Sequence, residues 1–109
     1  MGRWSQRRLS GGGPPALAPS SSCIQITPPA QGNGSHLTVI FAGDIDANDF
    51  NTSDWETTPG LFVPDDVTQG ASNALELNFN DDIEGETSLN FNGAVTGVCS
   101  PQSVPIEIV

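Results

Sequence analysis

Apolar and polar residues alternate with a period of two along most of the chain from Cys23 onward. The alternation is strict in Leu75-Glu76-Leu77-Asn78-Phe79, and Leu89-Asn90-Phe91 repeats it. Successive side chains of a β-strand point to opposite faces, so each of these runs predicts a half-buried strand. No stretch shows the 3.6-residue apolar stripe of an amphipathic helix. The sequence therefore predicts an all-β fold.

Turn residues divide this part of the chain into six or seven short strands. Pro28-Pro29 is expected to end the first strand, and the run from Gln31 to Gly34 is expected to form a turn. In the last strand, Pro105 indicates a sheet edge because proline cannot donate a ladder hydrogen bond. This spacing predicts an antiparallel sandwich of about seven strands, with a closed barrel as the alternative.

Apolar residues on one face of each run are the expected core. In the strand at 37–41 these are Leu37, Val39 and Phe41, and in the last strand they are Val104, Ile106 and Ile108. The segment between residues 44 and 58 is polar and irregular. Phe50 and Trp55 are expected to reach inward from it.

Charge is segregated along the chain. The three basic residues are Arg3, Arg7 and Arg8, and all thirteen acidic residues lie at or beyond Asp44. The formal charge is −10 for the whole chain, and 13 acidic and no basic residues give −13 for residues 9–109. A body without Lys or Arg is not expected to bind nucleic acid, because phosphate contacts need those cations. No apolar run approaches the ~20 residues of a membrane span.

The composition changes at Ser22. Residues 1–22 are rich in glycine, proline and serine, and such a segment buries too little apolar surface to offset the entropy of ordering. We therefore expect two regions, a disordered or extended basic arm at 1–22 and a self-sufficient domain at 23–109. The apolar run of the arm is too short for a secretory signal of roughly 7–15 apolar residues, which argues against export by that route.

The two cysteines, Cys23 and Cys99, allow one disulfide bond that would close a long loop. Such a bond stabilises a fold by about 4 kcal/mol. Because no export signal is recognised, a reducing compartment and two free thiols are slightly favoured. The disulfide stays open as the alternative.

Three stretches resemble the immunoglobulin-like domains of bacterial surface proteins and phage structural proteins. They are residues 37–41 with the aspartate-rich loop that follows, residues 50–55, and residues 67–79. Residues 93–104 are similar to the loop before the final strand of that family. The resemblance covers about residues 23–109 and implies an immunoglobulin-like β-sandwich. It also implies an adhesive or architectural role without catalytic residues.

Two acidic segments are candidates for metal binding. Asp44, Asp46 and Asp49 alternate like the start of a calcium loop, but an EF-hand needs Gly at the sixth position and Glu at the twelfth, where Asp49 and Trp55 stand. A solvated acidic loop is therefore favoured over a Ca²⁺ site, and no cofactor is expected. Residues 81–86 are interpreted in the same way, as a charged hairpin tip.

Catalysis is not expected, because His36 is the only histidine and no motif pairs it with a nucleophile. The arm offers Arg3, Trp4, Arg7, Arg8 and Leu9, and Arg and Trp are residues that often anchor protein interfaces. We therefore expect a partner with acidic surface rather than a nucleic acid or a membrane.

The favoured hypothesis is a non-enzymatic assembly protein, with the domain docked by its arm on a larger structure. A phage capsid decoration protein or another minor virion protein fits best, with a major capsid protein as the partner and a homo-oligomer as a further option. The alternative is a secreted adhesion or carbohydrate-binding module at the cell surface. That alternative predicts a Cys23–Cys99 disulfide and bound Ca²⁺.

Overall fold

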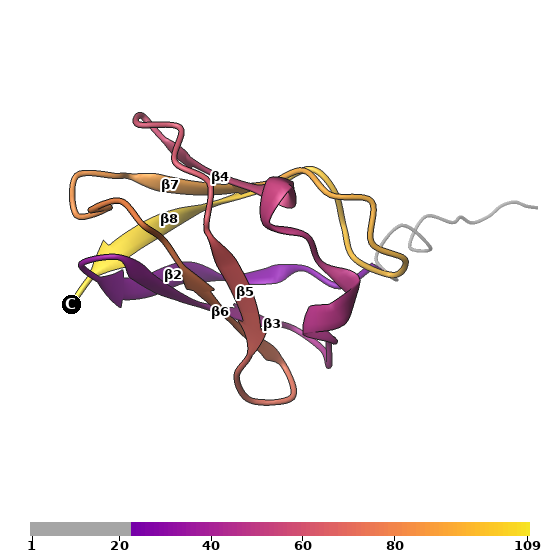
Figure 1. Cartoon of the computed structure of the whole chain (residues 1–109). Helices are drawn as coiled ribbons and strands as arrows, with labels where there is room; N and C mark the ends of the chain where they lie inside the picture. The colour runs from indigo at the N-terminus through magenta and orange to yellow at the C-terminus, as the bar shows by residue number, and fades with distance from the viewer. Residues whose placement is uncertain (1–22) are drawn as a thin grey trace, which may run out of the picture.

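The computed structural model describes residues 23–109. The arm expected at 1–22 lies outside the described residues. Among the described residues the chain forms seven strands and two short 3-10 helices (Figure 1). The strands are β2 (Ile26–Asn33), β3 (His36–Phe41), β4 (Trp55–Thr58), β5 (Asp66–Gln69), β6 (Ala74–Asn78), β7 (Ser88–Phe91) and β8 (Gln102–Ile108), and the 3-10 helices are η3 (Ala47–Asp49) and η4 (Thr52–Asp54). The all-β fold predicted from the sequence is confirmed.

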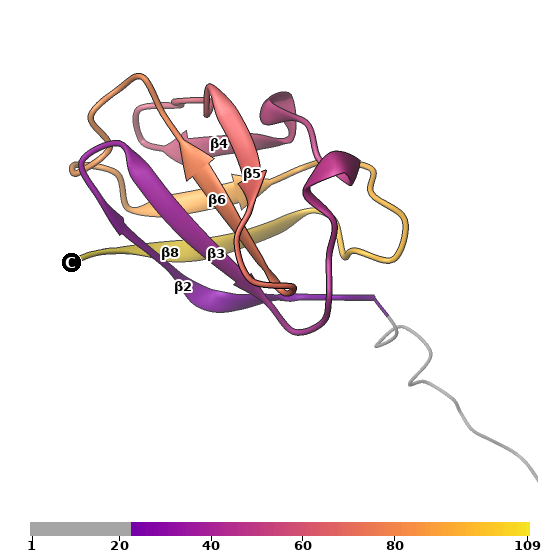
Figure 2. The ribbon, with the colours of Figure 1, turned by 60° about the horizontal axis from the view of Figure 1, so that its bottom comes forward.

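The seven strands form one sheet in the order β4-β7-β8-β2-β3-β6-β5. Neighbouring strands are antiparallel except β2 and β8, which pair in parallel. The prediction of a wholly antiparallel arrangement is therefore wrong, and the sheet is mixed. It curls around the apolar side chains, so that the β4 side and the β5 side cover the same core (Figure 2).

Strand β8 changes partner part-way along its length. Residues 102–105 pair with β7, whereas residues 106–108 pair with β2. Pro105 lies at this changeover, opposite Ser88. Strand β8 as a whole is not a sheet edge, contrary to the expectation from Pro105, because the edges are β4 and β5; at Pro105 itself, however, β8 pairs with β7 alone. A missing N–H is tolerated here because the strand leaves one ladder for the next.

Strand β2 continues through Pro28-Pro29, so the expectation that these prolines end a strand is also wrong. The peptide bond between them is cis, and the pairing with β3 shifts register between Thr27 and Gln31. Such an irregularity accommodates residues that cannot donate to the ladder. The turn to β3 is correspondingly tighter than expected, with Gly34 at a φ of 57°.

The core confirms the faces predicted from the alternation. Leu37, Val39 and Phe41 of β3 are all buried. Phe50 and Trp55 reach inward as expected, and Trp55 packs at 4.7 Å between ring centroids from Phe91. In β8 the expectation holds only in part: Val104 is buried, Ile106 packs against the core and Ile108 is exposed. Rings of Phe41 and Phe50 complete an aromatic cluster around Trp55.

A disulfide joins Cys23 to Cys99, 76 positions apart in the sequence. The slight preference for two free thiols is therefore wrong for this structure. That preference depended on the compartment, whereas the pairing follows from backbone geometry. Ile24 and Val98 form a parallel bridge, which brings the neighbouring Cα atoms of the two cysteines to 5.0 Å. That separation is normal for a disulfide.

Within residues 23–109 there is no helix of the length and apolar character needed to cross a membrane.

Candidate binding surfaces

One hollow on the described surface lies over β4, β7 and β8 and has a volume of about 700 Å³. We call it the β7 hollow, because β7 runs through its centre. It is lined by Ser53, Asp54, Trp55, Glu56, Val63, Asn90, Phe91, Asn92, Pro101, Gln102 and Ser103. Most of these side chains carry hydrogen-bonding groups.

Strand register places three polar residues in a row across this surface. Glu56 of β4 is opposite Asn90 of β7, which is opposite Ser103 of β8. The Asn90 amide donates to Thr58 Oγ1 at 2.7 Å, and its carbonyl oxygen accepts from Ser103 Oγ at 2.7 Å. The middle of the row is therefore held rigidly by contacts within the sheet.

Two further lining residues, Gln102 and Asp54, are also held by internal hydrogen bonds. Gln102 accepts from the backbone N–H of Ile26 at 2.8 Å and donates to the carbonyl of Cys99 at 2.7 Å. Asp54 accepts from the backbone N–H of Asn51 at 2.9 Å. Gln102 thus ties the wall of the β7 hollow to the loop that carries Cys99.

Other lining groups stay available to a ligand. Within residues 23–109, the side chains of Ser53, Glu56 and Asn92 make no hydrogen bond. Trp55 and Phe91 are fully buried, so this surface presents no aromatic ring for stacking. The Trp55 indole N–H is buried without a hydrogen-bond partner among the described residues. The exposed chemistry of the hollow is therefore hydrogen bonding and negative charge, beside two exposed apolar residues, Val63 and Pro101.

A second hollow of about 230 Å³ lies beside the disulfide. We call it the aspartate hollow. Its wall is apolar, and its three carboxylates are the calcium candidates from the sequence, which are exposed. It is lined by Ile24, Asp44, Ile45, Asp46, Asp49, Phe50, Val95, Thr96 and Val98.

The fold brings Asp44, Asp46 and Asp49 to one hollow, but they do not converge as a set of metal ligands. No group of three or more metal-binding side chains occurs in the described part of the chain. One carboxylate has a local structural role, since Asp46 accepts from the backbone N–H of Asn48 at 2.9 Å and caps η3. This arrangement provides a negative rim rather than a coordination shell.

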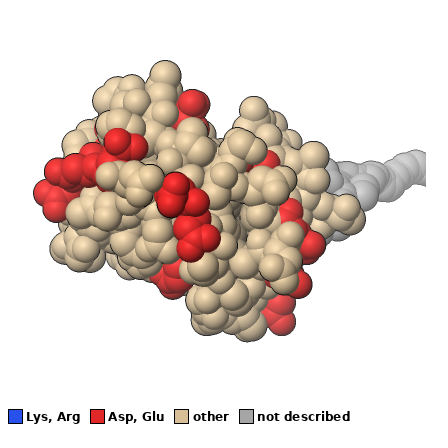
Figure 3. Space-filling model, in the orientation of Figure 1, with Lys and Arg blue, Asp and Glu red and all other residues tan. Residues whose placement is uncertain are grey.

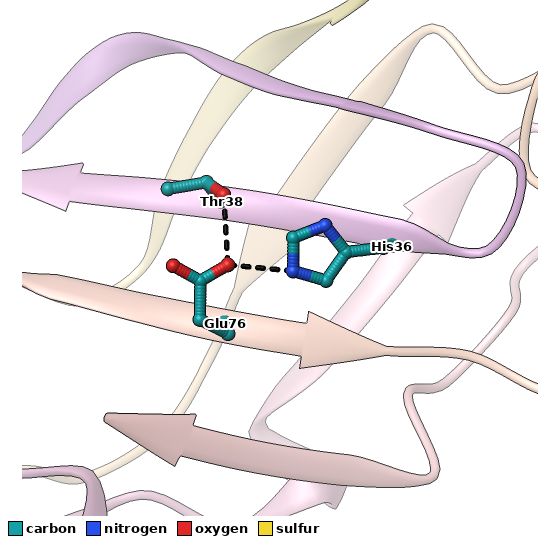
Figure 4. A network of polar contacts seen from close by, with 3 residues as sticks. All are labelled: His36, Thr38 and Glu76. Carbon is teal, nitrogen blue, oxygen red and sulfur yellow. Dashed lines mark hydrogen bonds and ion pairs between the residues drawn. The ribbon is translucent and has the colours of Figure 1, made fainter. Parts of the chain in front are cut away.

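His36 lies outside both hollows, in a small polar network on β3 and β6 (Figure 4). Its Nε2 lies 2.6 Å from Glu76 Oε1, and Thr38 Oγ1 donates to the same oxygen at 2.8 Å. A nucleophilic triad needs the histidine between the hydroxyl and the carboxylate. Here the carboxylate lies between the other two, so the network pairs two strands and does not activate Thr38.

The sequence interpretation of residues 81–86 as a charged, solvated tip is wrong for two of its members. Ile83 is fully buried and Glu86 is only 8% exposed. Glu86 Oε1 accepts from Thr57 Oγ1 at 2.7 Å and from the Gly60 backbone N–H at 2.6 Å. No spacing in the sequence distinguishes Glu86 from its exposed neighbours, because its donors come from residues 26 and 29 positions away.

The described surface is negatively charged. Residues 23–109 contain no Lys or Arg, and Figure 3 shows carboxylates spread over the visible face. The predicted arm contacts Arg3, Trp4, Arg7, Arg8 and Leu9 lie outside the described residues. No protein-family model, curated protein or solved structure matches this chain.

Proposed function

We propose that this chain is a non-enzymatic binding module that works outside the reducing cytoplasm, as a cell-surface adhesion or carbohydrate-binding domain of the immunoglobulin-like type. The observation that carries the proposal is the Cys23–Cys99 disulfide. Disulfides persist in oxidising surroundings and are rare in reducing ones.

The β7 hollow is the proposed ligand site. Its volume of about 700 Å³ is in the range of pockets that hold small ligands. Sugar hydroxyls both donate and accept hydrogen bonds, which matches the carboxylate of Glu56 and the amide of Asn92. Asn90 is held in place by Thr58 and Ser103, which reduces the entropy lost on binding.

A binding assay tests this assignment. We expect the purified chain to bind one class of polyhydroxylated glycan on an array, and we expect Glu56→Ala with Asn92→Ala to weaken that binding at least tenfold, about 1.4 kcal/mol. Asp65→Asn with Asp66→Asn is the matched control, since these exposed residues lie outside the hollow. Equal binding by the two variants would contradict the site.

The oxidising location is tested separately. Protein taken from its native source without reductant should show no alkylated cysteine by intact mass, and two after reduction. Two reactive thiols in the native protein would remove the observation on which the proposal depends.

A second candidate, an arm-docked virion protein, is favoured by the segregation of charge. All basic residues of the chain lie within the first eight positions and all acidic residues at or beyond position 44. Under this proposal Arg3, Trp4, Arg7 and Arg8 bind acidic surface on a larger assembly, such as that of a major capsid protein, while residues 23–109 project into solvent.

Deletion of residues 1–22 tests the second candidate. Incorporation into the assembly should be lost, while the melting temperature of the remaining domain should change little because its core and disulfide are intact. Normal incorporation of the truncated chain would refute docking through the arm.

A further inference from the structure

We propose that the aspartate hollow is a docking site for the basic N-terminal segment of the same chain, with Trp4 against the apolar wall and Arg3, Arg7 and Arg8 beside the aspartates. This inference goes beyond the proposed function and does not depend on it. Its basis is the chemistry of the hollow, its position beside Cys23, and the composition of residues 1–8.

The hollow combines an apolar wall with a negative rim. Phe50 and Val98 are buried in the wall, whereas Ile24, Ile45 and Val95 are partly exposed within it. Asp44, Asp46 and Asp49 are exposed around the wall. A ligand that fits both parts needs an apolar group and positive charge close together.

Within this chain, only the N-terminal segment combines the two. Residues 23–109 contain no Lys or Arg, so every arginine that can pair with the aspartates is Arg3, Arg7 or Arg8. Trp4 lies among them and supplies a large apolar surface. Arg and Trp are also the side chains that most often dominate binding energies at interfaces.

The position of the hollow favours the segment of the same molecule. Cys23 is held to Cys99 by the disulfide, and the residues beside these cysteines, Ile24 and Val98, belong to the wall of the hollow. Trp4 precedes Cys23 by 19 positions, a length that spans up to roughly 60 Å when fully extended. The segment therefore reaches the hollow easily, and the covalent link gives it an effective concentration on the order of millimolar.

Fluorescence quenching tests the proposal with the full-length chain. Tryptophan is the dominant fluorophore, because the chain has two tryptophans and no tyrosine. Trp55 is 0% exposed, so quenching by acrylamide reports mainly on Trp4. The variant Trp4→Phe gives the residual quenching of Trp55 as a baseline.

The expected result is protection of Trp4 that depends on the three aspartates. At low salt the quenching constant of Trp4 should be roughly threefold lower in the wild type than in Asp44→Asn/Asp46→Asn/Asp49→Asn, since exposed ion pairs each contribute a fraction of a kcal/mol. Sodium chloride at about 0.5 M should raise the wild-type constant, because it screens these pairs. Asparagine retains the oxygen with which Asp46 caps η3, so η3 should persist in the variant.

Control measurements distinguish the proposed site from nonspecific charge attraction and from binding of a second copy of the chain. Asp65→Asn/Asp66→Asn/Asp81→Asn removes the same charge from outside the hollow and should leave the protection intact. An equal loss of protection in this variant would overturn the site in favour of nonspecific attraction. Protection that disappears on dilution, with a dimer mass in light scattering, would assign the hollow to a second copy and overturn the same-chain proposal. A fully accessible Trp4 in the wild type at low salt would overturn it outright.

Discussion

The two ends of the curled sheet are held together in different ways, one by a disulfide and the other by hydrogen bonds to a buried carboxylate. At one end the Cys23–Cys99 disulfide fixes the start of the domain to the loop before β8. At the other end no disulfide joins the described residues. There the buried carboxylate of Glu86 holds the loop after β4 through Thr57 and Gly60.

The two ends are therefore stabilised by two different mechanisms, one acting on the unfolded chain and one acting on the folded chain. The disulfide acts mainly by restricting the unfolded chain, so its stabilising effect does not depend on its neighbours being well packed. Glu86 acts only in the folded state, because its oxygen is removed from water and must be compensated by both donors. The loop it holds includes Leu61, which has a φ of 59° and is 60% exposed.

Removing the Cys23–Cys99 disulfide should produce the largest loss of stability. Cys23→Ala with Cys99→Ala should lower the free energy of unfolding by about 4 kcal/mol, because the 76-position loop is no longer closed in the unfolded chain. Urea denaturation followed by Trp55 fluorescence measures this loss. A change below about 1 kcal/mol would mean that the disulfide adds little to this end.

Removing the buried carboxylate of Glu86 should have an intermediate effect on stability. Glu86→Ala leaves the buried Thr57 hydroxyl and the Gly60 N–H without their acceptor, which should cost about 2–3 kcal/mol. The same denaturation experiment applies, and Glu86→Gln is the control because it keeps an acceptor oxygen. Amide hydrogen exchange should accelerate at Gly60 and Phe62 in the alanine variant only. Equal stability of the alanine and glutamine variants would contradict this role of Glu86.

Removing a partly exposed carboxylate with similar partners should have the smallest effect. Glu76 also accepts from a threonine, and it contacts His36, but its side chain is 28% exposed and that of His36 is 42% exposed. Solvent screens such a pair, so Glu76→Ala should cost less than about 1 kcal/mol. A double-mutant cycle with His36→Ala isolates the pair. A loss as large as that of Glu86→Ala would show that burial does not explain the comparison.

Much of the fold was predictable because it depends on local alternation. The inward faces of β3, β6 and β7 follow from period two in the sequence, since neighbouring side chains of a strand must point to opposite faces. The inward positions of Phe50 and Trp55 were predicted for a different reason, because they are large apolar residues in an otherwise polar segment. The three aspartates of the aspartate hollow were also recognised, though as calcium candidates.

Strand partners were less predictable, because pairing joins segments that are distant in the sequence. A proline in a strand indicates a sheet edge, because proline has no N–H to donate. At Pro105, however, β8 exchanges β7 for β2 as its hydrogen-bonded partner, so the strand as a whole lies inside the sheet. Pro28-Pro29 indicates the end of a strand, but a register shift lets β2 continue. The residues next to these prolines predict neither the change of partner strand nor the register shift.

The sequence by itself determined an acidic all-β body, its core-facing residues and the separation of basic from acidic charge, because these depend on residue type and short-range order. Only the tertiary structure decided that Cys23 meets Cys99, that Glu86 is buried, and that Glu56, Asn90 and Ser103 form a row across three strands. Each of these contacts depends on which strands pair and in which register, and backbone hydrogen bonds between distant segments set both.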